Sequence, residues 1–396
     1  MTDLQLGITA LLRSALFGTQ AQLPEAFDFQ QALTLGRAHQ ILPLLFYGVQ
    51  NSGLSVPTEV KSALRTATLQ SAMVDQSQKT AGDAIFSALE QKALDYMPLK
   101  GILRKSAYPQ PEMRPMSDLD ILIRPEQYDQ IRPLMAELGF TESYESDHEL
   151  AWRKPGGLLV ELHKHIIPSY NRDYYAYFGD GWKLAQPVAG YTYRYAMKPE
   201  DSLIYELTHM AKHYRDGGIG IRHLTDVYLC AQGEALDRGY IRQELQKLKL
   251  WDFYQNVLAT GKVWFANGTA NEKTDFITEY IFSSGSYGTM DQKFLAGAVR
   301  MAQTERRATA GVRWRKLLRM TFPSYARLRG RYPALNRMPV LLPVFWVVRW
   351  VEVLFFRPSS IQHEMAGFGK ATGKQVDEFE QALRYVGLEF ESEHKG

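Results

Sequence analysis

The stretch "RPMSDLDILIRPE", residues 114–126, decides the fold, because it sets two aspartates into a segment that is otherwise apolar. Side chains alternate between the two faces of a β-strand, so Leu119 faces one way while Asp118 and Asp120 face the other. If the apolar set faces a core, both carboxylates stand together on the open face. Two like charges that close raise one of the two pKa values unless a cation lies between them. The stretch therefore predicts a strand that carries a metal site.

The stretch "LLVELHKHI", residues 158–166, places another acid in an apolar strand. Its apolar residues alternate with Glu161 and His163, so these two side chains share one face. We expect Glu161 to join the two aspartates as the third carboxylate, and Glu149 in the preceding stretch "DHELAWR" is the alternative. Oxygen ligands favour hard cations, so the expected metal is Mg²⁺ or Mn²⁺. Solvated acids at a strand edge are the structural alternative for the Asp-x-Asp pair.

The segments around these two strands predict a small α/β core between helical regions. "YMPLK" reads as a strand, "GILRKSAY" as a short helix, "PEQYDQIRPLMAELGF" as a helix, and "KPGG" as the turn of a hairpin. A Thr2 cap opens the helical N-terminal region, and "KPEDSLIYELTHMAKHY" and "IRHLTDVYLCAQ" are helical after the core. The predicted fold class is α+β, with a small mixed sheet flanked by N-terminal and C-terminal helical lobes. We expect four segments: a helical lobe at 1–95, the α/β core at 96–195, a helical lobe at 196–300, and a basic and amphipathic helical region at 301–396.

The composition favours a folded, cytoplasmic protein. The chain has 396 residues, of which 45% are hydrophobic and 22% charged, the balance of a globular protein. One cysteine, Cys230, excludes an internal disulfide, and the N-terminus lacks the basic region of a secretory signal. The longest apolar run leads into a helix from Pro343 to Arg357 of about 22 Å, shorter than a hydrocarbon core of about 30 Å. We therefore expect no membrane span.

A basic stretch from Arg306 to Arg337 contains ten Lys or Arg residues and no Asp or Glu. Aromatic residues, Trp314 and Tyr325 among them, are interleaved with these cations. This mixture suits a nucleic acid, an anionic membrane surface, or simply a solvated face. The expected localisation is cytoplasmic, with a peripheral position at the inner membrane face as the alternative.

The core stretch "PLKGILRKSAYPQPEMRPMSDLDILIRPE" resembles the nucleotidyltransferase superfamily typified by DNA polymerase beta, and in particular an uncharacterised bacterial branch of it. The shared features are a glycine-containing turn after a strand, a helix, an Asp-x-Asp strand and a later third acid. The match covers residues 97–168 well. It implies a polymerase beta-like fold in which Asp118, Asp120 and Glu161 bind the metal ions, while the helical lobe at 196–300 closes over the cleft.

The resemblance also implies contacts with a nucleotide. Gly101 and Ser117 would approach the triphosphate, although the superfamily usually has Gly-Ser or Gly-Gly at this turn. Here Gly101 precedes an isoleucine, and sixteen residues intervene before Asp118, more than is usual in the superfamily. Lys100 and Arg114 could supply the positive charge that a triphosphate requires. Surface cations that balance nearby acids are the alternative for both.

Two pairs of residues four apart lie in the helices after the core. His209 and His213 share a helix face, a spacing that can bind a metal, but the sequence offers no evident third ligand. Helix packing or a nucleotide contact is therefore the favoured interpretation. Arg222 and Asp226 are expected to form an intrahelical ion pair.

The predicted function is metal-dependent transfer of a nucleoside monophosphate from a nucleoside triphosphate (NTP) to an acceptor hydroxyl, with release of pyrophosphate. Two alternatives remain open at this point. One is a nucleotide-binding module that docks nucleic acid or an anionic membrane through residues 306–337. The other is a toxin-like transferase that acts on tRNA. The sequence does not define the acceptor, the NTP or the oligomeric state.

Overall fold

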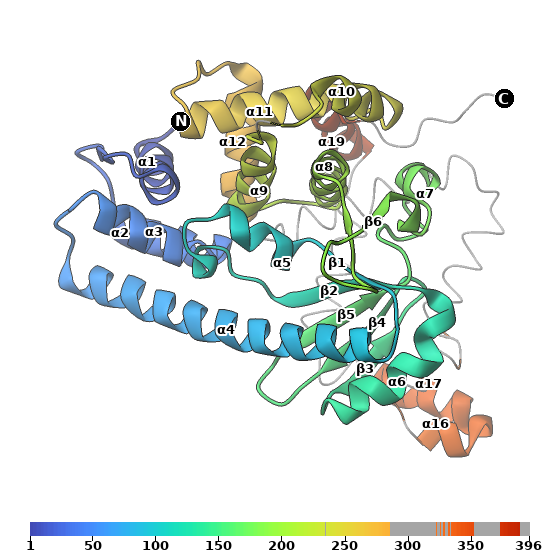
Figure 1. Cartoon of the computed structure of the whole chain (residues 1–396). Coiled ribbons are helices and arrows are strands. Elements are labelled where there is room, and N and C mark those ends of the chain that lie inside the picture. Colours follow the sequence, from blue (N-terminus) through green and yellow to red (C-terminus); the bar gives the residue numbers. More distant parts are fainter. Residues whose placement is uncertain are drawn as a thin grey trace. The chain divides into compact units, whose positions relative to one another are not determined.

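A five-stranded mixed sheet contains the Asp-x-Asp strand, and its order is β1-β2-β5-β4-β3 (Figure 1). β2 pairs in parallel with β5, and the remaining pairs are antiparallel. A parallel pair requires a crossover connection, and here the chain between β2 and β5 contains α6 and the β3-β4 pair. The strands are β1 (Tyr96–Pro98), β2 (Asp118–Ile123), β3 (Thr141–Glu145), β4 (Glu149–Arg153) and β5 (Leu159–His163).

The computed structural model describes residues 1–233, 235–285, 322, 325, 328, 332, 334–351 and 373–388. The chain divides into two compact units, which are described separately: the first unit holds residues 1–289 and 384–396, and the second unit holds residues 290–383.

One face of the sheet is packed on apolar helix residues. Leu119, Ile121 and Ile123 of β2 lie in a buried cluster with side chains of β4, β5, α4 and α6. Figure 1 shows α4 running across this side of the sheet. The predicted alternation is confirmed, because the apolar residues of β2 face this core and the two aspartates face the opposite side.

Helices surround the sheet in the first unit, and they confirm the predicted α+β class with helical flanks. The expected helices at the N-terminus, after β2 and after residue 198 are all present, and Thr2 caps the first of them. They are α1 (Asp3–Phe17), α2 (Phe29–His39), α3 (Leu42–Asn51), α4 (Thr58–Gln91), α5 (Gly101–Arg104), α6 (Tyr128–Glu137), α7 (Arg172–Phe178), α8 (Pro199–Arg215), α9 (Ile221–Ala231), α10 (Arg238–Lys247), α11 (Trp251–Phe265) and α12 (Glu272–Ser284).

Helix α4 connects the N-terminal helices to the sheet. With 34 residues it is about 51 Å long at 1.5 Å per residue. Its C-terminal half contributes Ile85 and Leu89 to the core below the sheet. Midway along α4, Gln78 Nε2 donates to the Met116 carbonyl at 2.7 Å and so fixes the loop that enters β2.

Three strands were not predicted from the sequence. The edge strand β3 has five exposed residues, and its sequence "TESYE" lacks apolar alternation. Strands β6 (Ala185–Pro187) and β7 (Tyr195–Met197) form a separate antiparallel pair. The expected boundaries at residues 95, 195 and 300 remain predictions.

The described part of the second unit includes short helices around a small apolar cluster. Leu328, Tyr332 and Leu335 are buried there against residues that include Phe345 and Trp346. The elements are α16 (Ala334–Arg337), a 3-10 turn (Pro339–Leu341) and α17 (Leu342–Val351), while α19 (Gly373–Tyr385) ends in the first unit. Among the described residues, no helix combines the length and the apolar character needed to cross a bilayer.

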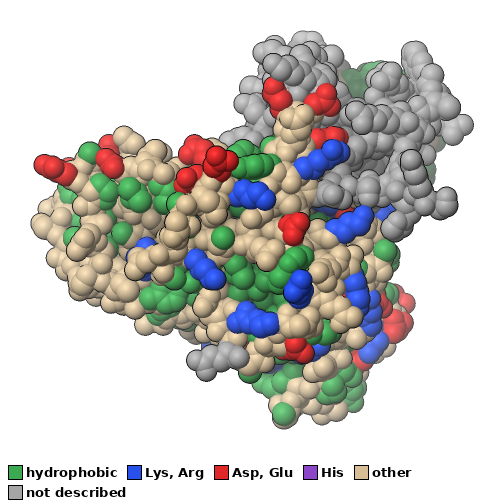
Figure 2. Space-filling view, turned by 90° about the horizontal axis from the view of Figure 1, so that it is seen from above, with side chains coloured by type: hydrophobic (Ala, Val, Ile, Leu, Met, Phe, Trp, Pro, Cys, Tyr) green, Lys and Arg blue, Asp and Glu red, His purple; other side chains and the backbone are tan. Residues whose placement is uncertain are grey.

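Most of the basic stretch at 306–337 lies outside the described residues, which include only 322, 325, 328, 332 and 334–337 of it. Figure 2 shows one face of the molecule, on which charged side chains of both signs are spread among apolar ones. The described part of that face therefore presents no large area of one charge.

Candidate active site

A cavity of about 280 Å³ lies between the acidic face of the sheet and helices α8 and α9. Strands β2, β4 and β5 supply one wall, and the first turns of α9 with the middle of α8 supply the other. The structure brings all seven predicted site residues together in the lining of this cavity: Lys100, Gly101, Arg114, Ser117, Asp118, Asp120 and Glu161.

The register of the sheet places Glu161 directly beside Asp120. These two residues are paired across the parallel strands β2 and β5, and partners in such a pair point to the same face. Asp118 stands two residues earlier on the same face of β2. One oxygen each from Asp120 and Glu161 lies within 4.8 Å of a ring nitrogen of His163. Two neighbouring strands therefore aim their carboxylates into one pocket.

Among the three acids of β2 and β5, Asp120 carries the charge that is best compensated. Its Oδ1 accepts from His163 Nε2 at 2.6 Å and from Lys100 Nζ at 3.3 Å. Burial by itself would raise the pKa of Asp120, but the charges and hydrogen bonds of Lys100 and His163 bring that pKa well below its ordinary value. Asp120 is thus ionised although it is only 5% exposed.

The other two acids lack such compensation. Burial, and then the charge of Asp120, raise the pKa of Asp118. Burial, followed by the charges of Asp120, Glu149 and Asp118, raises the pKa of Glu161 to about 7. Carboxylates this close together repel one another when all are ionised. A hard divalent cation, which prefers oxygen ligands, stabilises their ionised forms. The residues present therefore fit Mg²⁺ or Mn²⁺.

Glu149, the alternative third acid, also lines the cavity but is held differently. Its Oε2 lies 2.9 Å from His148 Nε2, and its Oε1 accepts from the Tyr144 hydroxyl at 2.6 Å. Burial would raise the pKa of Glu149, but the hydrogen bonds from His148 and Tyr144 lower it to about 2. In the register of the sheet Glu149 pairs with His163, one row away from Asp120 and Glu161. The geometry favours Glu161 as the ligand beside Asp120.

The turn after β1 holds Lys100 in a strained conformation. Its φ of 43° and ψ of −116° lie outside the regions that L-residues usually occupy. Strain of this kind is often found at functional sites, where surrounding contacts maintain it. Lys100 thus combines a strained backbone with a side-chain ammonium group that contacts Asp120 in the cavity.

Gly101 and Ser117 line the cavity near the N-terminal end of β2: Ser117 directly precedes the strand, and Gly101 packs against the loop that leads into it. A Cβ on Gly101 would come within 2.6 Å of Met116 Sδ and 3.0 Å of Arg114 Nη1, so a larger residue at this position would displace these two side chains. The Ser117 hydroxyl lies 3.4 Å from Asp118 Oδ1. Contacts of these two residues with a triphosphate remain a prediction.

Arg114 forms a buried, two-pronged ion pair with Asp226. Its Nε donates to Oδ1 at 3.0 Å, and its Nη2 donates to Oδ2 at 2.8 Å. The Tyr108 hydroxyl donates to the same carboxylate at 2.8 Å. The expected pairing of Arg222 with Asp226 is wrong, because Arg222 Nη1 instead donates to the Pro115 carbonyl at 2.6 Å. The ion pair of Arg114 and Asp226 joins the loop before β2 to α9.

Several residues of the cavity were not singled out from the sequence. Helix spacing could have identified Glu206, because it lies on the same side of α8 as His209 and His213. His148 lines the cavity and contacts Glu149, which also accepts a hydrogen bond from Tyr144 of the edge strand β3, and no local pattern in the sequence marks either residue. His223 completes a group with His209 and His213, which the sequence had left without a third member.

Comparison with known proteins identifies a family to which the chain is similar. A family model described as "Uncharacterised nucleotidyltransferase" matches residues 25–266, which span the N-terminal helices from α2, the whole sheet and helices α8 to α11. No curated protein and no solved structure matches the chain.

Proposed function

Because the chain belongs to this family of uncharacterised nucleotidyltransferases, we propose that it transfers a nucleoside monophosphate from an NTP to an acceptor hydroxyl and releases pyrophosphate. The protein is a transferase that takes a nucleotide substrate. The observation that carries the proposal is the meeting of Asp118, Asp120 and Glu161 in one cavity, from two neighbouring strands.

The three carboxylates are the residues that would hold Mg²⁺ or Mn²⁺. When bound, such ions neutralise phosphate oxygens and favour both attack by the acceptor and departure of pyrophosphate. Asp118 and Asp120 would hold the ions through their carboxylate oxygens from β2, and Glu161 would do so from β5. We propose that Glu161 also orients the acceptor hydroxyl.

Cations on both sides of the cavity provide for the charge of a triphosphate. Lys100 reaches into it from the turn after β1, and Lys212 and Arg222 line the opposite wall. Charged donors of this kind bind phosphate oxygens strongly. Arg114 contributes less directly, because Asp226 already occupies two of its donor groups.

A contact of residues 306–337 with nucleic acid or with an anionic membrane surface stays a prediction, because most of these residues lie outside the described part of the chain. The same holds for a cytoplasmic or peripheral location.

The test is a transfer assay with each NTP labelled on its α-phosphate, Mg²⁺ or Mn²⁺, and a cell extract as the source of acceptors. We expect label to enter one class of molecule with the unaltered protein and to fall to background with Asp118→Asn and with Asp120→Asn. Asp129→Asn, an exposed change on α6, serves as the matched control and should transfer normally. Undiminished transfer by both active-site variants would refute the proposal.

A further inference from the structure

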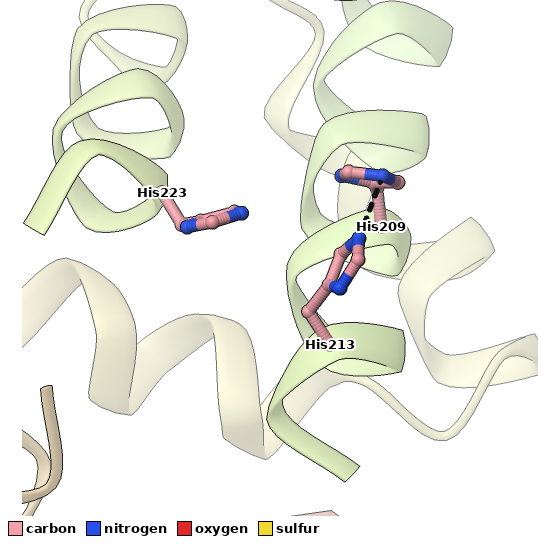
Figure 3. Close-up of side chains that lie close together, drawn as sticks. All are labelled: His209, His213 and His223. Atoms are coloured by element: carbon pink, nitrogen blue, oxygen red, sulfur yellow. Dashed lines mark hydrogen bonds between the residues drawn. The ribbon is translucent and has the colours of Figure 1, made fainter. Parts of the chain in front are cut away.

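Three histidines meet on the wall of the cavity that faces the acids (Figure 3). His209 and His213 lie one turn apart on α8, and His223 extends toward them from the first turn of α9. The Nε2 atoms of His209 and His213 are 3.0 Å apart. One ring nitrogen from each of the three residues lies within 4.8 Å of the other two.

These separations are close to those of ligands around one metal ion. Zinc binds histidine nitrogen at about 2.0–2.1 Å, so two ligands of a tetrahedral ion are about 3.4 Å apart. The pair on α8 is already near that distance, and a closer approach of the His223 ring would bring the third nitrogen to it. A side-chain rotation on one helix supplies such a movement.

The protonation state of the three rings is the one that binds metal. Burial lowers the pKa of His209 and His213 well below the ordinary value, and it lowers the pKa of His223 to about 3. Neutral imidazole has a free nitrogen lone pair for a metal. Neighbouring positive charges contribute to these low pKa values, among them Lys212 and Arg222.

The charges around the cavity favour a bound cation in spite of those two residues. Four Lys and Arg side chains and six Asp and Glu side chains line the cavity, which leaves two negative charges when all of them are ionised. Glu206 is the carboxylate on the same helix face as His209 and His213. It is 4% exposed, and Arg104 Nε lies 3.9 Å from its Oε2.

Two existing hydrogen bonds would have to change. The hydrogen bond between the Nε2 atoms of His209 and His213 would be replaced by bonds from both atoms to the metal. The Gly220 amide donates to His223 Nδ1 at 3.2 Å, so the neutral ring carries its proton on Nε2. Binding through Nε2 moves that proton to Nδ1 and gives up the contact with Gly220. Loss of two hydrogen bonds is a small cost compared with formation of three metal-nitrogen bonds, and the change of tautomer at His223 is a signature that can be measured.

We propose that His209, His213 and His223 bind one divalent transition-metal ion of the Zn²⁺ type, with a fourth position open to the cavity. Nitrogen ligands select such ions over Mg²⁺, and three histidines with an open position are a pattern of reactive zinc sites. The site is separate from the carboxylates across the cavity, and its existence does not depend on which reaction those carboxylates support.

The test is a Zn²⁺ titration of the full chain, freed of metal with EDTA, at pH 7.5 with excess Mg²⁺ present to occupy the carboxylates. Competition with a chromophoric chelator measures affinity and stoichiometry. We expect one Zn²⁺ per chain, and binding weaker by about 100-fold or more in His213→Gln and in His223→Gln, because even outer-shell partners of zinc ligands are worth about 10–100-fold.

His148→Gln is the matched control, since His148 belongs to a different histidine-containing cluster of the cavity, with Glu149 and His163. It should bind Zn²⁺ as the unaltered protein does. Unchanged affinity in His213→Gln and His223→Gln, or loss in His148→Gln alone, would overturn the proposal.

A second measurement keeps the proposal testable if a variant does not fold. Co²⁺ added to the unaltered protein should give the intense visible absorption of a tetrahedral nitrogen site, and ¹⁵N spectra should show the ring proton of His223 moving to Nδ1. The weak absorption of octahedral Co²⁺ would count against the site, as would an unchanged His223 tautomer.

Discussion

Replacing Glu161 with glutamine is expected to stabilise the metal-free protein and to abolish transfer at the same time. Glu161 is buried beside Asp120, and the pKa of its carboxyl rises from the ordinary 4.5 to about 7. The fold therefore favours the protonated form of this side chain. Glutamine has nearly the same shape, carries no charge, and can still accept the hydrogen bond that Tyr144 donates to Glu161 Oε1 at 3.2 Å.

The size of the effect follows from the two pKa values. A group whose pKa is higher in the folded than in the unfolded chain contributes stability that is fully present below the unfolded value and is lost as pH rises through the folded value. For Glu161 that window runs from about 4.5 to about 7. The difference of about 2.5, at about 1.4 kcal/mol for each pKa unit, gives about 3 kcal/mol.

The assay is urea unfolding in EDTA at pH 5 and at pH 8.5. At pH 8.5 the free energy of unfolding of Glu161→Gln should exceed that of the unaltered protein by about 2–3 kcal/mol, while at pH 5 the two should differ by less than about 1 kcal/mol. Mg²⁺ should raise the stability of the unaltered protein at pH 8.5 and should raise that of the variant less, because a ligand that binds only the folded state stabilises it.

Glu149→Gln is the matched control on the adjacent strand, because the pKa of Glu149 is lowered to about 2. The same substitution should therefore destabilise the protein at pH 6, by about 1–3 kcal/mol. The account of charge repulsion in the cavity would be wrong if Glu161→Gln were less stable than the unaltered protein at pH 8.5. It would also be wrong if both substitutions changed the free energy of unfolding in the same direction.

Three further changes test the structure around the site. Lys100→Gly should be more stable than Lys100→Ala by about 1–2 kcal/mol in urea unfolding, because only glycine relieves the backbone strain at φ 43°; equal stabilities would mean that the turn is not strained. Arg114→Lys should lower the free energy of unfolding by about 2–4 kcal/mol, since lysine cannot make both hydrogen bonds to the buried Asp226; a loss below about 0.5 kcal/mol would contradict this. Burial lowers the pKa of His39 to about 4, so the unfolded chain takes up a proton between pH 6.5 and 4 that the folded chain does not, and stability should fall as pH decreases through that window by about 3 kcal/mol. In His39→Gln the melting temperature should depend less on pH over the same range. If the melting temperature of both proteins changed identically with pH, His39 would not be the source of this pH dependence.

The sequence alone was enough to find the acidic strands. In "DLDILI" and "LLVELH" the alternation of apolar and acidic residues reflects the two faces of a strand, and this period is a local property of the backbone. It identified the face of β2 that packs on the core, the two carboxylates on the opposite face, and Glu161 on β5. Helix spacing and the Thr2 cap likewise located the helices on both sides.

The pairings across the cavity depended on the tertiary structure. Arg114 and Asp226 are 112 residues apart in the chain, and the helix spacing that suggested Arg222 as the partner of Asp226 says nothing about a cation delivered by a distant loop. The edge strand β3 was missed for a related reason, because hydrogen bonding to β4 holds it in place rather than an apolar pattern of its own.

His223 illustrates the same division between local pattern and folded chain. The four-residue spacing of His209 and His213 was visible in the sequence, but the third ring comes from another helix, and only the packing of α8 against α9 sets its distance from the pair. A local period determines which side chains share a face. Which faces meet is decided by the burial of apolar surface over the whole chain, so the composition of the cavity appears only when that chain is folded.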